Sequence, residues 1–335
     1  MPSIKDVAKL AGVSVSTVSR VINESEDVDE RTRATVLDAI KKLDYKPSFV
    51  AKGLRGKSGN LIGLVVPESM EHAFTSIINY TIEVAYKKGF NVILGNTHND
   101  PDIEEKFIDD LLRRNVDGIL FSRVSDESRV LHKIGKTKVP IVIIDRTLDK
   151  EGIPGVVLNN YKAGSLAAKH LCELGHNKIA CITGPLNIAL CRERLRGFKD
   201  VLKENNIEFN DDCVYEGNFK YISGIEAVRH FRANNFEFTA IWAQNDMMAL
   251  GVLRELLLKG IRVPQDISVM GMDDIGFGQM MVPSLTSIHY PFREMCEKAI
   301  DLLITQKEQE EVENKMIVLE PNLVVRDSTG QPFHQ

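Results

Sequence analysis

The chain is poor in cysteine, and its few cysteines are not spaced for a structural or metal-binding role. It has five in 335 residues, an odd number with no CxxC spacing, which argues against a disulfide framework or a zinc site. No apolar run approaches the roughly 18 residues of a membrane span, and the opening MPSIKDVAKLAG holds no stretch of signal-peptide length. These absences predict free buried thiols in a cytoplasmic protein that binds no metal and does not enter a membrane.

Catalytic signatures are missing as well. The eight histidines form no HExxH or HxxEH pair, and the chain has no GxSxG elbow and no GxGxxG after a strand. Residues 56–58, Gly-Lys-Ser, resemble the end of a phosphate-binding loop, but Ala51 stands where that motif needs its first glycine, and no strand precedes it. The sequence therefore predicts no catalytic residues and no cofactor, and an enzyme is disfavoured.

Charge is distributed unevenly along the chain. The net charge of −5 is by itself unfavourable for binding nucleic acid, but residues 1–59 carry 11 Lys and Arg against 8 Asp and Glu, a net charge of +3. The remaining 276 residues carry −8, and the segment from Lys46 to Lys57 has four basic residues and no acid. A small basic module joined to an acidic body is expected where only one end of a protein meets phosphates.

The N-terminal module has the pattern of three short helices. Ser3 is expected to cap the first, whose apolar residues from Ile4 to Ala11 follow helical spacing. Gly12 supplies a tight turn, and Ser14 caps the second helix. A third helix follows Asp29, and its expected buried stripe is Val36, Leu37, Ile40 and Leu43.

The exposed face of the second helix favours DNA binding over a plain helical bundle. It has short polar side chains and one arginine, with no acid from Val13 to Asn23, whereas a merely solvated face usually mixes both signs. A helix-turn-helix places such a second helix in the major groove. The residues predicted to contact DNA from this module are Ser14, Val15, Ser16, Thr17, Ser19, Arg20, Asn23 and Tyr45.

Two runs carry a resemblance to a known family. SIKDVAKLAGVSVSTVSRVIN and the later YKPSFVAKGLR are similar to the headpiece of the lactose/galactose-repressor family of bacterial regulators. The IxDVA start, the AGVS turn, the TVSRVxN recognition helix and the YxPxxxAxxL hinge appear in that order. The resemblance implies a sequence-specific transcription regulator, a repressor, that binds a near-palindromic double-stranded DNA operator as a homodimer.

Residues 47–59 form the segment that joins the module to the body. A helix over Ser48–Arg55 would have only about two turns and be marginal in water, so a flexible linker is the plain interpretation. The resemblance implies more: the segment folds on operator DNA, pairs with its dimer mate and inserts Leu54 into the minor groove. The residues expected to contact DNA here are Ala51, Lys52, Leu54 and Arg55.

After residue 60, apolar strands alternate with helices, which predicts α/β architecture with parallel strands covered on both faces. Strands are expected at Leu61–Val66, Asn91–Leu94, Gly118–Phe121 and Ile141–Ile144, and again at Lys178–Thr183, Asp212–Glu216, Ala240–Ala243 and Ser268–Met272. The two sets are similar in sequence, so the body is expected to have two doubly wound lobes flanking a cleft. This body also resembles the family and the periplasmic sugar-binding proteins.

The expected domain organisation follows from these patterns and from the resemblance. Residues 1–46 form the helix-turn-helix headpiece, 47–59 the hinge helix and linker, and 60–335 the effector-binding and dimerisation domain. The resemblance implies that the chain crosses between lobes near residues 160, 289 and 320. The N-lobe then comprises about 60–159 plus 289–319, and the C-lobe about 160–288 plus 320–335.

Polar residues at the ends of the expected strands are candidates for effector binding, because open α/β sheets bind ligands there. Capping of the next helix, or pairing with a surface acid, is the alternative for each. Carboxylates, amides and guanidinium groups match sugar hydroxyls, and an aromatic ring can stack on a sugar face. The predicted effector residues, several supported by the resemblance, are Phe74, Arg123, Asp145, Arg146, Arg194, Phe219, Asn245 and Asp273.

The effector is expected to be a monosaccharide or a derivative, and residues 144–146, Ile-Asp-Arg, favour a small one such as ribose. Tyr290 stands where several family members carry glutamine, so no specific sugar is carried over. A sugar-binding transport protein is the main alternative, and it would need a signal peptide and no DNA-binding headpiece. The chain stops at VVRDSTGQPFHQ without a leucine heptad, which predicts a dimer rather than a tetramer.

Overall fold

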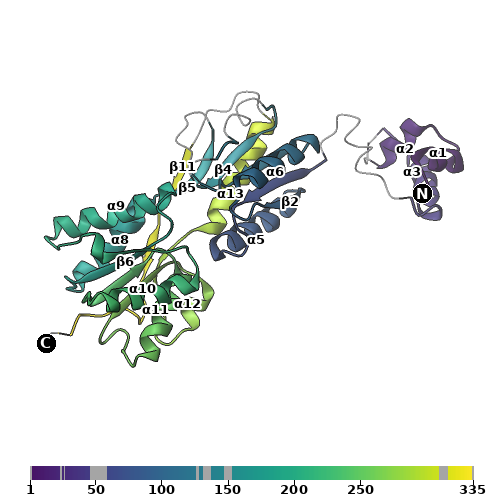
Figure 1. Ribbon diagram of the computed structural model, residues 1–335. Helices are drawn as coiled ribbons and strands as arrows, with labels where there is room; N and C mark the ends of the chain where they lie inside the picture. Colours follow the sequence, from purple (N-terminus) through teal and green to yellow (C-terminus); the bar gives the residue numbers. More distant parts are fainter. Residues whose placement is uncertain are drawn as a thin grey trace. The chain divides into compact units, whose positions relative to one another are not determined.

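The structure, a computed structural model, describes residues 2–22, 25, 27–45, 59–125, 128–130, 137–146, 153–308 and 316–333. Its contacts divide the chain into two units, Met1–Gly59 and Asn60–Gln335, which we call the headpiece and the body. Figure 1 shows a headpiece of short helices and a body in which helices flank sheets. The expected class, a helix-turn-helix followed by a two-lobed α/β body, is confirmed.

The described residues of the headpiece form three helices: α1 Ile4–Ala11, α2 Val15–Ile22 and α3 Glu30–Lys42. The turn between α1 and α2 depends on Gly12, whose φ of 65° lies in the left-handed region that glycine adopts without strain. The Oγ of Ser14 accepts a hydrogen bond of 3.1 Å from the backbone N–H of Thr17, so Ser14 caps α2 as its sequence position indicates.

A small core of valines and alanines holds the three helices together. Val7, Val18 and Val36 are fully buried in it, one from each helix. The expectation that Leu37 belongs to this core is wrong, because its side chain is 52% exposed. Val36, Ala39, Ile40 and Leu43 follow the i, i+3, i+4, i+7 spacing of one helix face, and Leu37 lies off that stripe.

The body contains two six-stranded sheets. The first has the strand order β11-β5-β4-β3-β1-β2, with β1 Leu61–Val66, β2 Asn91–Asn96, β3 Gly118–Phe121, β4 Ile141–Asp145, β5 Gly155–Leu158 and β11 Met316–Leu319. The second has the order β12-β10-β9-β8-β6-β7, with β6 Ile179–Thr183, β7 Val214–Glu216, β8 Ala240–Ala243, β9 Ser268–Asp273, β10 Thr286–His289 and β12 Asn322–Val324. All described pairings are parallel except β10 with β12, which is antiparallel.

Helices cover both faces of each sheet, which explains the continuous apolar runs. In β1, Leu64 belongs to one core cluster and Val65 to another on the opposite face. In the part of the first lobe that the structure describes, the helices are α5 His72–Lys87, α6 Pro101–Arg113 and α13 Phe292–Glu308. Those of the second are α8 Asn160–Glu173, α9 Ala189–Glu204, α10 Tyr221–Ala233, α11 Asp246–Leu258 and α12 Gly276–Met280.

The chain passes from one sheet to the other three times. It crosses between β5 and α8, returns between β10 and α13, and crosses again between β11 and β12. The loops that follow the carboxyl ends of β4, β8 and β9 thereby contribute to one space between the lobes. Among the described helices, none combines the length and apolarity that a membrane crossing requires.

Candidate functional site

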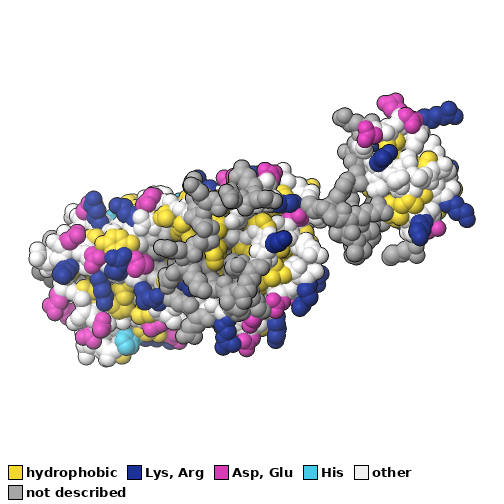
Figure 2. Space-filling model, turned by 90° about the horizontal axis from the view of Figure 1, so that it is seen from above, with side chains coloured by type: hydrophobic (Ala, Val, Ile, Leu, Met, Phe, Trp, Pro, Cys, Tyr) yellow, Lys and Arg dark blue, Asp and Glu magenta, His cyan; other side chains and the backbone are white. Residues whose placement is uncertain are grey.

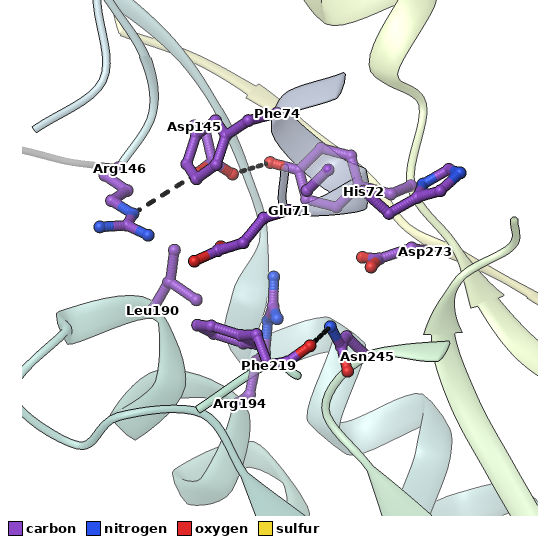
Figure 3. Close-up of a pocket in the computed structure, with 12 residues that line it drawn as sticks. Glu71, His72, Phe74, Asp145, Arg146, Leu190, Arg194, Phe219, Asn245 and Asp273 are labelled. Atoms are coloured by element: carbon purple, nitrogen blue, oxygen red, sulfur yellow. Dashed lines mark hydrogen bonds and ion pairs between the residues drawn. The ribbon is translucent and has the colours of Figure 1, made fainter. Parts of the chain in front are cut away.

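A small cavity of about 30 Å³ lies between the two lobes (Figure 3). Its walls come from the start of α5, the ends of β4, β8, β9 and β10, the helix α9 and the loop after β7. The lining residues are Glu71, His72, Ala73, Phe74, Asp145, Arg146, Leu190, Arg194, Phe219, Asn245, Asp273 and Tyr290.

Asp145, at the end of β4, is held by a short contact across the cavity wall. The Tyr290 hydroxyl donates a hydrogen bond of 2.6 Å to Asp145 Oδ1, and the Tyr290 ring stacks on Phe292 with centroids 4.2 Å apart. Burial, with Asp145 beside it, raises the pKa of Tyr290 well above its usual value, so the hydroxyl keeps its proton and remains a donor. This contact joins the strand end of one sheet to the crossing segment after β10.

Two arginines enter the wall from opposite lobes, and both donate to protein acceptors. Arg146 donates through Nη1 to the backbone oxygens of Arg123, at 3.1 Å, and Val124, at 2.5 Å. Arg194, on α9, donates through Nε to the Oδ1 of Asn160 at 2.8 Å and through Nη1 to the backbone oxygen of Gln244 at 3.0 Å. These bonds fix both guanidinium groups in place before any ligand is bound.

Asn245 caps α11 and orders a neighbouring loop. Its Oδ1 accepts from the backbone N–H of Met248 at 2.9 Å, and its Nδ2 donates to the backbone oxygen of Phe219 at 2.8 Å. The capping role that was the alternative for a polar residue at a strand end is therefore present at Asn245. Phe219 is held in the left-handed region at φ 64°, so the bond from Asn245 supports a strained conformation that places a ring in the wall.

Two carboxylates face the cavity without a hydrogen bond from the described residues: Glu71 at the start of α5 and Asp273 at the end of β9 (Figure 3). Burial raises the pKa of Glu71 to about 7. Burial also raises the pKa of Asp273 well above its usual value, with the Asp246 carboxylate adding to the rise and Arg194 opposing it. The cavity thus offers two acceptors to a hydroxylated ligand.

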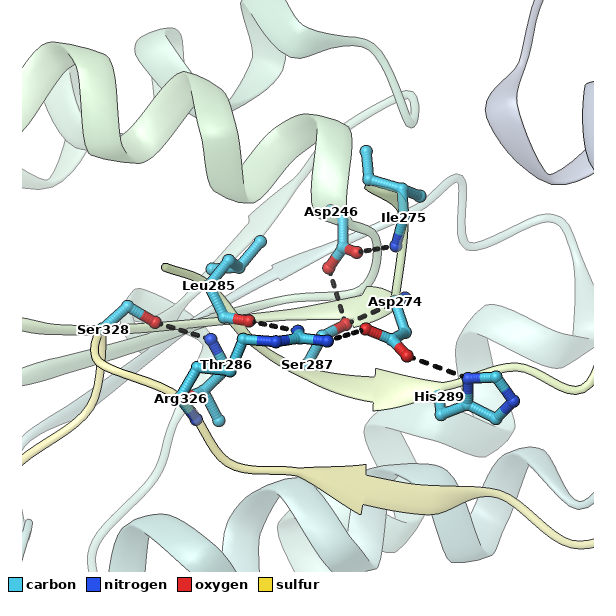
Figure 4. A network of polar contacts seen from close by, with 9 residues as sticks. All are labelled: Asp246, Asp274, Ile275, Leu285, Thr286, Ser287, His289, Arg326 and Ser328. Atoms are coloured by element: carbon cyan, nitrogen blue, oxygen red, sulfur yellow. Dashed lines mark hydrogen bonds and ion pairs between the residues drawn. The ribbon is translucent and has the colours of Figure 1, made fainter. Parts of the chain in front are cut away.

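A buried polar network lies directly behind Asn245 and Asp273, formed by the residue that follows each (Figure 4). Asp246 accepts from the backbone N–H of Ile275 at 2.8 Å and from the Ser287 hydroxyl at 2.7 Å. Asp274 forms an ion pair with Arg326, and the ring of His289 lies 3.0 Å from its Oδ2. The network ties β8, β9 and β10 to the C-terminal segment and fixes the loops that carry the site.

The structure brings seven of the eight residues predicted for effector binding to this one cavity. The exception is Arg123, which is buried near Glu104 and does not line the space. Sequence reasoning did not assign five lining residues to the effector site: Glu71, His72, Ala73, Leu190 and Tyr290. Leu190 lies one helical turn before Arg194, and Glu71 immediately precedes the helix that carries Phe74, so helix geometry from those two predicted residues was the available signal.

The residues predicted to contact DNA from α2 lie on the headpiece surface to different degrees. Ser14, Ser16 and Arg20 are exposed, whereas Val15 is half-buried and packs against the headpiece core. The partly buried positions in this set are Val15, Thr17, Ser19 and Tyr45. The remaining predicted contacts lie outside the described residues: Asn23, Ala51, Lys52, Leu54 and Arg55.

The described residues contain no group of three or more His, Cys, Asp or Glu side chains arranged to hold a metal ion. All five cysteines are unpaired, and Cys181 and Cys191 are fully buried. Burial raises the pKa of the Cys191 thiol to about 12, so this thiol beside the cavity stays protonated and unreactive.

Comparisons with known proteins identify the family to which the chain belongs. The model of bacterial regulatory proteins of the lacI family matches residues 3–48, and that of the periplasmic binding protein-like domain matches residues 168–329. The transcriptional repressor PurR of Mannheimia succiniciproducens is 38% identical over 98% of both chains. This chain belongs to the lacI family. The resemblance seen in its headpiece and hinge is therefore confirmed.

The fold of this lacI-family protein is also similar to those of solved structures. The Lac repressor dimer bound to operator and the anti-inducer ONPF has a TM-score of 0.90 and 30% identity, over 98% of this chain and 99% of that one. The complex of the transcriptional regulator CelR with cellobiose has a TM-score of 0.75 and 31% identity, over 98% and 100%. The lacI-family protein is a DNA-binding transcriptional repressor under the control of a ligand.

Proposed function

We propose that this repressor binds a small polyhydroxylated effector, a monosaccharide or a derivative, in the cavity between its lobes. The observation that supports this most is the convergence of Asp145, Arg194 and Asp273 with the rings of Phe74 and Phe219 on one cavity. Carboxylates and guanidinium groups match adjacent hydroxyls, while the rings can cover an apolar sugar face. A relative in complex with cellobiose supports a sugar as the class. The cavity then serves binding rather than catalysis.

The proposed effector acts by bridging the lobes. It contacts Asp145 and Arg146 from the first sheet and Arg194 and Asp273 from the second, so binding favours one relative position of the lobes over another. The segment 47–59 connects the first lobe to the headpiece and transmits that preference to DNA binding. Coupling of this kind is typically about 1–3 kcal/mol, and its sign decides whether the effector releases or promotes repression.

We propose that the DNA is read at two places, by α2 in the major groove and by Leu54 in the minor groove. An apolar wedge parts a base step and kinks the duplex, which costs a few kcal/mol that added contacts offset. Leu54→Ala is therefore expected to weaken operator affinity about ten-fold and to reduce the DNA bend, measured by gel shift with permuted operator positions. Leu37→Ala, which shortens an exposed leucine in α3, is the matched control. An unchanged bend in the Leu54 variant would contradict the wedge.

We further propose that the repressor is a homodimer joined in part by an apolar surface of the second lobe. Leu257 is 71% and Val282 is 92% exposed, and both border a surface cavity with Tyr221, Leu250 and Leu253. Apolar patches lie between charged side chains on the face seen in Figure 2, as is usual for a protein surface. A concentration of exposed aliphatic side chains at one cavity is the mark of an interaction surface.

Val282→Asp is expected to shift the dimer toward monomer, because the interface would bury an unpaired carboxylate. We expect the dimer dissociation constant to rise about ten-fold or more in sedimentation experiments. Val325→Asp is the control, since Val325 is also exposed but does not border that cavity. Equal dimer dissociation constants for the two variants would mean that the dimer interface does not include this cavity.

Binding-site selection with and without candidate sugars tests the proposed function as a whole. We expect enrichment of a near-palindrome whose recovery changes when one sugar of a panel is present. A repressor that acts on operator DNA works in the cytoplasm, which is the compartment we propose. Failure to enrich any duplex would reject the DNA-binding role, and enrichment unaffected by every sugar would reject the effector class.

A further inference from the structure

The cavity that we propose for the effector has more carboxyl groups than guanidinium groups in its wall. Three carboxylates line it, those of Glu71, Asp145 and Asp273, against the guanidinium groups of Arg146 and Arg194. His72 does not correct the balance, because burial lowers the pKa of its ring and keeps it neutral. Burial raises the pKa of Glu71 to about 7 and that of Asp273 well above its usual value, so the negative charge that a ligand meets in this space grows as the pH rises.

The two cations are also engaged with the protein itself. Arg146 donates to two backbone oxygens and lies over the ring of Phe74, with the guanidinium carbon 5.1 Å from the ring centroid. Arg194 donates to Asn160 and to the backbone oxygen of Gln244. These bonds use Nη1 of Arg146 and both Nε and Nη1 of Arg194, and the remaining Nε of Arg146 lies 3.9 Å from Asp145 Oδ2. Neither guanidinium group therefore offers all of its donors to the bidentate binding of a phosphate or carboxylate group.

The carboxylates of Glu71 and Asp273 are in the opposite situation. Neither accepts a hydrogen bond from a described residue, and both face the cavity from different lobes. Each is an acceptor that only a ligand or water can satisfy. A ligand rich in hydroxyl donors fits them, while an anionic group is repelled by them.

We propose that Glu71 and Asp273 make this cleft selective for an uncharged polyol, so that a sugar binds and its phosphate ester is rejected. The inference rests on the proposed effector site and names the chemistry which that site accepts. Glu71 is the residue that can be altered most cleanly, because it makes no hydrogen bond to a described residue that its removal would break. Asp145 and Arg146 from the β4 end, Glu68 on its own segment and Lys220 from the second lobe are the charged groups around it.

The charge of Glu71 also makes the selectivity depend on pH. Its pKa of about 7 leaves it largely ionised at pH 8 and largely protonated at pH 6. The rejection of anionic ligands by wild type is therefore expected to be stronger at pH 8, which is the condition for the test.

The test uses matched pairs, D-ribose with ribose 5-phosphate and D-glucose with glucose 6-phosphate, with fructose and galactose and their phosphates added. Isothermal titration at pH 8 is carried out on the full chain as wild type, Glu71→Gln and Glu68→Gln. We expect at least one free sugar to bind wild type at least ten-fold more tightly than its phosphate ester. In Glu71→Gln the affinity for the phosphate ester should rise about ten-fold relative to that for its parent sugar, because one negative charge that repels the phosphate is removed.

The controls separate charge from size. Glutamine has the shape of glutamate, so Glu71→Gln does not relieve a steric rejection, and an unchanged ratio in that variant would overturn the role of Glu71. Glu68 lies three residues before Glu71, and its side chain does not line the cavity. Glu68→Gln should therefore keep the wild-type ratio of sugar affinity to phosphate-ester affinity.

Two further outcomes distinguish this inference from the proposed function. A phosphate ester that binds wild type as tightly as its parent overturns the inference; if Arg194→Ala abolishes that binding, the cavity is still the effector site. Binding of no free sugar at 10 mM, roughly the weak limit of such titrations, overturns both the inference and the sugar class. Operator binding by the same preparation then still reports on the repressor function.

Discussion

Gly164→Ala is expected to lower the free energy of unfolding of the body by about 3 kcal/mol or more. Gly164 lies on α8, and a Cβ built there would come within 1.8 Å of the backbone oxygen of Arg194 on α9. Gly197 shows the reciprocal contact, since its Cβ would lie 2.0 Å from the backbone oxygen of Tyr161. Because the obstacles are backbone atoms, no side-chain rotation relieves the clash, and the two helices must separate.

The separation would act on function as well as on stability. The obstructing oxygen belongs to Arg194, whose side chain lines the effector cavity, so moving α9 moves that guanidinium group away from Asn160 and Gln244. Urea unfolding should show the loss of stability, and Gly276→Ala is the matched control because its Cβ would meet no atom within 4 Å. Equal unfolding midpoints of the two variants would mean that α8 and α9 are not in close contact in solution.

The fold was largely predictable because both faces of each sheet are buried. That arrangement demands uninterrupted apolar runs, and such runs are visible in the sequence at β1, β3 and β8, whose bounds match the predicted ones. The strand predicted from Asp212 begins only at Val214, because Asp211–Cys213 form a short 3-10 helix. Strands β5, β10, β11 and β12 were not predicted, although they are about as short as β3 and β8. In β11 and β12 part of the strand is exposed, so these two lack the uninterrupted apolar run of a fully buried strand.

The candidate site was predictable where it follows strand ends and not where it depends on packing. Asp145 and Asp273 end β4 and β9, and the strand pattern located both. Arg123 also follows a strand, β3, but the sequence does not show that its side chain would be buried near Glu104 and away from the cavity. Glu71 lies at no strand end, and only its position immediately before α5, the helix that carries Phe74, indicates its place at the cavity.

Asp273→Asn is expected to have opposite effects on binding and on stability. Replacing the carboxyl group by an amide of the same shape should weaken the binding of the sugar that wild type binds most tightly by about ten-fold, as expected for the loss of one hydrogen-bond acceptor. Asparagine also tolerates the φ of 107° at this position better than most residues, so the fold should be retained. Isothermal titration measures the first effect, and thermal unfolding of the ligand-free protein measures the second.

The stability of the ligand-free variant should exceed that of wild type at alkaline pH. Burial raises the pKa of Asp273 in the folded state above its usual 3.8, so the folded protein binds this proton more tightly than the unfolded chain. The stabilisation is fully present below the unfolded pKa and is lost as the pH rises through the raised folded value. Asparagine carries no such penalty, and the gap between variant and wild type should widen as the pH increases from 4 to 9.

The adjacent aspartate supplies a control of opposite sign. Asp274 is also largely buried, but it forms an ion pair with Arg326 and contacts His289, so Asp274→Asn leaves a buried cation without its partner. That variant should lose about 2 kcal/mol of stability at neutral pH. Higher stability of Asp273→Asn together with lower stability of Asp274→Asn would show that the Asp273 carboxyl group destabilises the fold while it serves ligand binding. It would also show that the Asp274 carboxylate stabilises the fold. A loss of stability in both would mean that Asp273 has a partner within the protein and is not an open acceptor.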